Sequence, residues 1–84
     1  IVGSHTHIKT DDAQVYNNTC YITDMGMCGP NKSVLGDDPE AVISRFISGV
    51  FEPLPVANDD EYILSGVILD LGTVNKIESF KMIV

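Results

Sequence analysis

Two apolar segments near the end of the chain constrain its fold more than any other feature. Residues 62–71 carry apolar side chains on both faces of a would-be strand, which is typical of a strand covered on both sides. Residues 72–75 read Gly-Thr-Val-Asn and predict a turn, and residues 76–84 return as a second apolar strand. We therefore expect an antiparallel hairpin that other parts of a fold would cover.

One amphipathic helix is predicted upstream of this hairpin, over residues 39–48. Asp37 followed by Glu40 forms a D-x-x-E variant of the capping box, and Pro39 falls in the first turn, where its missing N–H is not needed. Gly49 is suited to end the helix. The apolar positions recur at helical spacing and form one stripe: Val42, Ile43, Phe46, Ile47 and Val50.

The rest of the chain is predicted to consist of short strands and loops. Residues 1–2 read as the end of a buried strand that Gly3 breaks, and residues 4–18 form a polar loop with at most one short strand. Residues 20–23 are rich in β-forming side chains and predict a strand. Residues 25–36 hold three glycines and predict a loop, and residues 51–56 are extended because two prolines cannot join a sheet ladder.

Composition limits both size and partners. A chain of 84 residues forms one domain at most, and 44% hydrophobic residues is generous for that length. Some of this apolar surface could therefore meet a missing part of the same fold or another copy of the chain. The formal net charge of −7 argues against a nucleic-acid polymer as partner, although it does not exclude small phosphate compounds.

Two further features concern location. No apolar run approaches the roughly 20 residues that a membrane-spanning helix needs, so no membrane partner is expected. Cys20 and Cys28 lack the spacing of a C-x-x-C motif, and we interpret them as two reduced thiols of a cytoplasmic protein. No signal sequence opens the chain, and Ile1 stands in place of an initiator Met, as if the sequence began inside a fold.

His5 and His7 are the only histidines, and they are two residues apart. In an extended backbone such residues point to the same face, and Gly3 just before them would let the chain bend. Both imidazoles could then bind one metal ion, or one each of two neighbouring ions. The motif is short, however, and taken alone it is explained more simply by two surface histidines in a polar loop.

Three acidic positions and one glycine-rich segment are further candidates. Asp11 and Asp12 could act as acid and base, but neighbours on a strand point in opposite directions, so solvated charge or a turn is the simpler interpretation. Asp24 follows a predicted strand and could be a site residue or a cap for the loop after it. Residues 26–30 could bind phosphate through backbone N–H groups, but they lack the lysine of a P-loop.

Several segments, taken in order, resemble one family of enzymes. Residues 2–12 read Val-Gly-Ser-His-Thr-His-Ile-Lys-Thr-Asp-Asp and are similar to Val-Gly-Thr-His-Thr-His-Val-x-Thr-Ala-Asp of the YmdB-like metallophosphoesterases, a branch of the calcineurin-like superfamily. Residues 21–30 read Tyr-Ile-Thr-Asp-Met-Gly-Met-Cys-Gly-Pro, close to that family's Tyr-Ile-Thr-Asp-Val-Gly-Met-Thr-Gly-Pro. The segments 33–36, 40–46 and 65–70 continue the likeness. Both histidines are kept.

The chain departs from the family pattern at several positions near these histidines. Ser4 stands in place of Thr, Lys9 in place of a usual Gln, and Asp11 in place of Ala. Cys20 and Cys28 replace small or hydroxyl-bearing residues. The changes at Lys9 and Asp11 leave the substrate preference open.

The resemblance implies an α/β fold, namely the C-terminal part of a four-layer α/β/β/α sandwich. It implies two divalent metal ions, Fe or Mn, with His5 as a ligand of one and His7 as a ligand of the other. The implied activity is hydrolysis of small phosphodiesters, with 2′,3′-cyclic nucleotides as the associated substrates.

The family's other metal ligands and its general acid lie upstream, and residues 1–84 contain none of them. We therefore expect a C-terminal segment of a single metallophosphoesterase domain, inactive without the remainder of that domain. The alternative is a small non-enzymatic binding domain that keeps the scaffold.

Overall fold

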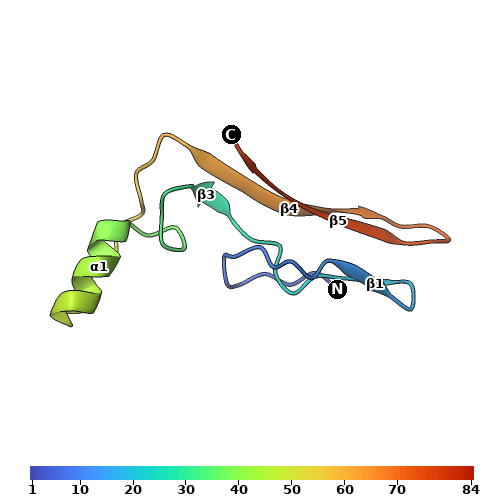
Figure 1. Cartoon of the computed structure of the whole chain (residues 1–84), viewed down its shortest axis with the longest axis horizontal. Coiled ribbons are helices and arrows are strands. Elements are labelled where there is room, and N and C mark those ends of the chain that lie inside the picture. Colours follow the sequence, from blue (N-terminus) through green and yellow to red (C-terminus); the bar gives the residue numbers. More distant parts are fainter.

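The longest elements of the fold are the two strands of a C-terminal hairpin. A computed structural model describes residues 1–84, and in it β4 (Tyr62–Asp70) pairs antiparallel with β5 (Lys76–Ile83) from Ile63↔Ile83 to Asp70↔Lys76 (Figure 1). The Gly72 N–H donates to Asn75 Oδ1 at 3.0 Å and closes the turn. The predicted hairpin and its turn are confirmed.

A third strand joins this hairpin where the sequence predicted only a loop. β3 (Cys28–Pro30) lies antiparallel to β4, with Gly29 opposite Ile63 and Pro30 opposite Tyr62. Pro30 is tolerated because it ends an edge strand, where its missing N–H breaks no central ladder. The prediction of a continuous loop over residues 25–36 is therefore wrong at these three residues.

A second, two-stranded sheet precedes it in the chain. β1 (Gln14–Tyr16) and β2 (Thr19–Tyr21) form a hairpin around Asn17 and Asn18, whose φ angles are 47° and 59°. A two-residue turn of this kind requires positive φ at both positions, and Asn is among the few residues that accept it. The Asn18 side chain accepts from the Asn75 N–H at 2.8 Å. This hydrogen bond joins the turn of the β1–β2 hairpin to the turn of the β4–β5 hairpin.

The helix α1 (Pro39–Ser48) has the predicted bounds but a different cap. Asp38 is the N-cap, and its carboxylate accepts from the Ala41 N–H at 3.0 Å, so the predicted capping role of Asp37 is wrong. Asp37 instead forms backbone bridges to Val34 and Val56. Gly49 ends the helix in the left-handed region, as predicted, with φ at 70°. No helix in the chain is long and apolar enough to cross a membrane.

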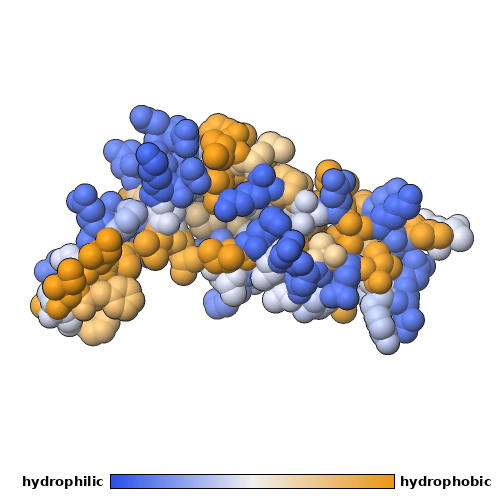
Figure 2. Space-filling view, viewed as in Figure 1, coloured by the Kyte–Doolittle hydropathy of each residue, from blue (hydrophilic) through white to orange (hydrophobic).

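The core is small, and much apolar surface stays open. Only 8 of 84 residues are buried, with Ile22 and Asp24 the most enclosed. The helix lies apart at one end of the molecule and exposes the apolar side chains of Phe46 and Ile47. Figure 2 shows hydrophobic surface over α1. Leu64 and Ile68 of β4 are exposed too. The chain by itself thus does not cover both faces of the hairpin.

Candidate functional site

The two histidines lie on a bend rather than on an extended segment. Residues 5–8 form the bend, and His7 adopts a φ of 68°, in the left-handed region. The expectation that an extended backbone places both imidazoles on one face is therefore wrong. Both side chains are exposed, so each remains available to a ligand.

A buried carboxylate fixes the residue between the two histidines. Asp24, only 1% exposed, follows β2 and accepts from both the backbone N–H and the hydroxyl of Thr6, each at 2.6 Å from its Oδ2. Its Oδ1 accepts from the Gly26 N–H at 2.8 Å. The Thr6 hydroxyl, followed by the Gly26 N–H, lowers the pKa of Asp24 from its usual 3.8 to about 2. Asp24 thus stays ionised near neutral pH and anchors the bend.

The ring of His7 is oriented by a backbone carbonyl. Its Nδ1 lies 2.9 Å from the carbonyl oxygen of Leu35, which precedes α1 and has a φ of 56°. A carbonyl oxygen only accepts, so Nδ1 of the neutral ring carries the proton and Nε2 keeps its lone pair. Metal-binding histidines usually donate their second N–H to a carbonyl or carboxylate in this way. The arrangement fits a metal ligand at His7 Nε2.

Gly3 serves the site through close packing. A Cβ atom at this position would lie 1.9 Å from the carbonyl oxygen of Thr23. The Gly3 N–H donates to Ile22 at 3.0 Å, and its carbonyl accepts from Met25 at 3.0 Å, so the strand leading to the histidines lies against β2 and its extension. The bend occurs at residues 5–8, and Gly3 is needed for contact between the two backbones rather than for bending.

The remaining acidic candidates have separate places. Asp12 accepts from Thr10 Oγ1 at 2.6 Å and from the Thr23 backbone N–H at 3.2 Å, and it also bonds the Thr23 hydroxyl. The Thr10 and then the Thr23 hydroxyl lower its pKa. Asp12 is therefore a structural carboxylate, while Asp11 is exposed, which favours the simpler interpretation of this pair.

The glycine-rich segment is not a phosphate-binding loop in this fold. The N–H of Gly26 donates to Asp24, and residues 28–30 form β3 on the edge of the sheet. The prediction that this backbone could bind phosphate is therefore wrong. Cys28 and Cys20 lie in different sheets and are both free thiols, as expected.

These residues could provide part of a metal centre. No group of three or more His, Cys, Asp or Glu side chains lies close enough in this chain to hold a metal ion. His5 and His7 are the available imidazoles, and their neighbours Thr6 and Leu35 position the bend. Sequence reasoning missed the role of Leu35, because a backbone carbonyl acts independently of its side-chain type.

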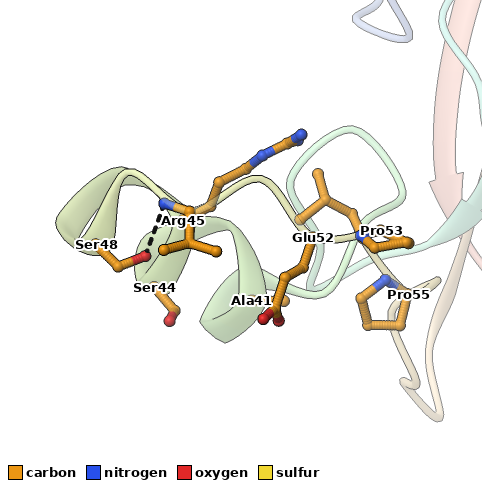
Figure 3. Close-up of a pocket in the computed structure, with 9 residues that line it drawn as sticks. Ala41, Ser44, Arg45, Ser48, Glu52, Pro53 and Pro55 are labelled. Carbon is orange, nitrogen blue, oxygen red and sulfur yellow. Dashed lines mark hydrogen bonds between the residues drawn. The ribbon is translucent and has the colours of Figure 1, made fainter.

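The largest cavity lies away from the histidines, beside the helix. It measures about 480 Å³ between α1 and the segment after it, and Figure 3 shows Ser44, Ser48 and Glu52 around it. The Arg45 guanidinium stacks over the ring of Phe51, with its carbon 4.5 Å from the ring centre. The cavity lies between α1 and the segment that follows it, and neither histidine lines it.

Comparison with known proteins gives consistent relatives. The sequence model of a family described as YmdB-like protein matches residues 1–83. The 2′,3′-cyclic-nucleotide 2′-phosphodiesterase of Bacillus subtilis (strain 168) is 40% identical over 77 residues, which cover 90% of this chain and 29% of that protein.

Two solved structures share the fold. The crystal structure of a phosphatase from Mycoplasma pneumoniae superposes with a TM-score of 0.86 at 36% identity, over 99% of this chain and 31% of that one. A hypothetical protein from Thermus thermophilus gives a TM-score of 0.79 at 27% identity, over 95% of this chain and 33% of that one. The chain therefore spans a third or less of the length of each of these relatives.

Proposed function

The chain belongs to the YmdB-like protein family, and from that premise we propose that it is part of a phosphoesterase with two divalent metal ions. His5 is assigned to one ion and His7 to the other. Fe or Mn is the proposed metal. The relatives named above as a phosphodiesterase and a phosphatase support phosphoester hydrolysis as the reaction class.

One observation carries the proposal, namely the hydrogen bond between His7 Nδ1 and the Leu35 carbonyl. This bond holds the tautomer that offers Nε2 to a metal ion, and it restrains rotation of the ring. Asp24 holds the backbone on the other side through Thr6. Because the backbone is held on both sides of His7, the bend needs little reorganisation when a metal ion binds to this residue.

Paired metal ions, when bound, would supply charge neutralisation at the phosphoryl oxygens and a water molecule of lowered pKa. The role of His5 and His7 is to bind as neutral imidazoles and keep the site in place. Two imidazoles do not complete a centre of this kind, so the further ligands and the general acid are assigned to other parts of the domain.

The exposed apolar surface supports a larger domain. The accessible surface is 6088 Å², whereas a compact protein of 9.1 kDa would expose about 4,900 Å². The radius of gyration is 16.3 Å, against about 12 Å for a compact chain of this length. We propose that the excess surface packs against the remainder of a four-layer α/β/β/α sandwich, over the open face of β4–β5 and the outer face of α1.

The proposed substrates are small phosphodiesters, with 2′,3′-cyclic nucleotides as the first candidates because of the Bacillus subtilis relative. The net charge of −7 argues against a nucleic-acid polymer. The two free thiols, Cys20 and Cys28, support a cytoplasmic protein. A non-enzymatic binding domain of 84 residues is the alternative, and the small core argues against it.

The test is substitution of each histidine in the full-length protein. His5→Ala and His7→Ala should each lower bound metal and reduce turnover of a chromogenic phosphodiester by at least about 10–100-fold, the cost typical of losing an outer-shell partner. Asp11→Ala is the matched control, because Asp11 is exposed and close in sequence. Full metal content and wild-type turnover in a folded histidine variant would remove that residue from the site.

A further inference from the structure

A second cavity, beside His7, is lined by two lysines that the proposed metal site does not use. It measures about 340 Å³ and lies between the histidine bend, the segment after β3 and the β4–β5 hairpin. Its polar lining includes His7, Lys9, Asn31, Ser33, Ser65 and Lys81. His7, whose ring is oriented by the Leu35 carbonyl, therefore lines a cavity together with two lysines.

The charge of this cavity is opposite to that of the chain. The sequence has five Lys and Arg residues against twelve Asp and Glu residues. Two of the five basic residues line the cavity, and none of the twelve acidic residues does. The cavity is therefore a local positive site on an acidic molecule, which favours an anionic ligand.

The lysines reach the cavity from different parts of the fold. Lys81 lies on β5 directly opposite Ser65 on β4, so both project from the same face of the sheet. Lys9 follows the histidine bend and is held by a backbone bridge to Met25, while its Nζ lies 3.5 Å from Ser79 Oγ. Lys9 and Lys81 thus come from separate elements, and it is the fold, rather than a run of charge along the sequence, that brings both residues to one cavity.

We propose that Lys9 and Lys81 bind a phosphate group of the substrate in this cavity. The inference rests on the proposed function, since it uses the position of His7 as a metal ligand. Ammonium groups donate charge-assisted hydrogen bonds to phosphate oxygens, and the Ser65 hydroxyl offers a neutral donor beside them. The bound group is either the phosphate that reacts or a second phosphate on the same molecule.

The first experiment does not depend on catalysis. Inorganic phosphate is titrated into the metal-free full-length protein by calorimetry, and Lys9→Gln and Lys81→Gln are each compared with wild type. Each substitution should weaken phosphate binding about 10-fold, and the double variant should lose it. Circular dichroism shows that each variant is folded, and Lys9→Arg and Lys81→Arg should keep most of the affinity.

Lys76→Gln is the matched control, because Lys76 is on β5 as well but lies outside the cavity. An equal loss of affinity in Lys76→Gln, or no phosphate binding by wild type, would overturn the proposal. If His5→Ala and His7→Ala kept their metal and turnover while the lysine variants lost phosphate affinity, only the proposed metal site would be rejected.

The second experiment identifies which phosphate is bound. Turnover is compared for a phosphodiester without a further phosphate and for the same diester carrying a terminal phosphate. A KM that rises in Lys81→Gln only for the second compound places the additional phosphate in the cavity, and a rise for both places the reacting phosphate there. An unchanged KM for both compounds would refute a substrate role for the lysines.

Discussion

Gly3→Ala tests whether the contact of two backbones beside the histidine bend is as tight as the structure indicates. The new Cβ would lie 1.9 Å from the Thr23 carbonyl oxygen, and real Cβ atoms stay at least 3.0 Å from such neighbours, so the two segments must separate by at least 1.1 Å. The hydrogen bonds from Gly3 to Ile22 and from Met25 to Gly3 are both 3.0 Å long and would then exceed bonding distance.

The expected cost follows from these two bonds. Each backbone hydrogen bond contributes about 0.5–1.5 kcal/mol, and replacing Gly by Ala recovers about 0.4–1 kcal/mol by restricting the unfolded chain. Buried polar groups left unpaired add a further penalty, so we expect a net loss of about 2 kcal/mol. In a protein of the size of the relatives this corresponds to a melting temperature lower by about 4–8 °C.

The assay is thermal unfolding of the full-length protein, followed by metal content of the folded variant. Gly72→Ala is the control, because a Cβ there meets nothing within 4 Å and should change the melting temperature by about 1 °C or less. Gly3→Ala should also lower metal content, because His5 lies two residues further along the displaced segment. A Gly3→Ala protein that melts within about 1 °C of wild type would refute the reasoning.

Three other predictions concern the cap, the anchor and the chain alone. Asp38→Ala removes the acceptor for the Ala41 N–H and should cost about 1 kcal/mol, measured by denaturant unfolding, and an unchanged midpoint would contradict the cap. The pKa of Asp24 is lower in the folded than in the unfolded chain, so its stabilisation is complete above about pH 4 and is lost as pH falls through about 2. Asp24→Asn should flatten the dependence of melting temperature on pH in that window, and an equal slope in both proteins would count against the anchor. The 84-residue chain alone should unfold without a cooperative transition, because only 8 residues are buried, and a sharp melting curve would favour the independent binding domain.

The helix and the C-terminal hairpin could be predicted because their signals are local. Pro39 and Gly49 mark the two ends of α1, and the four consecutive residues 72–75 predict the turn after β4. The choice between Asp37 and Asp38 as cap could not be settled locally, since both are acidic and adjacent. Asp37 is engaged instead by a backbone bridge to Val56, far along the chain.

The parts that could not be predicted depend on pairing over long sequence distances. β3 contains a Gly and a Pro, and it becomes a strand only because β4, more than 30 residues later, offers it a free edge. The site shows the same limit. The pair of histidines was visible in the sequence, but the bonds that position them were not. The Asp24 carboxylate binds Thr6, between the histidines, across 18 residues, and the Leu35 carbonyl binds His7 across 28.

The Leu35 carbonyl links the orientation of the His7 ring to the position of α1. Leu35 belongs to a tight turn in which Val34 and Asp37 exchange backbone hydrogen bonds of 2.9 and 3.0 Å, and α1 starts immediately after it. A shift of α1 would therefore displace the acceptor that holds the His7 ring. If metal binds at Nε2, thermodynamic reciprocity requires that metal binding in turn favours this position of α1. The affinity for metal would then depend on the position of α1, because the His7 imidazole is held by a carbonyl of the turn before that helix.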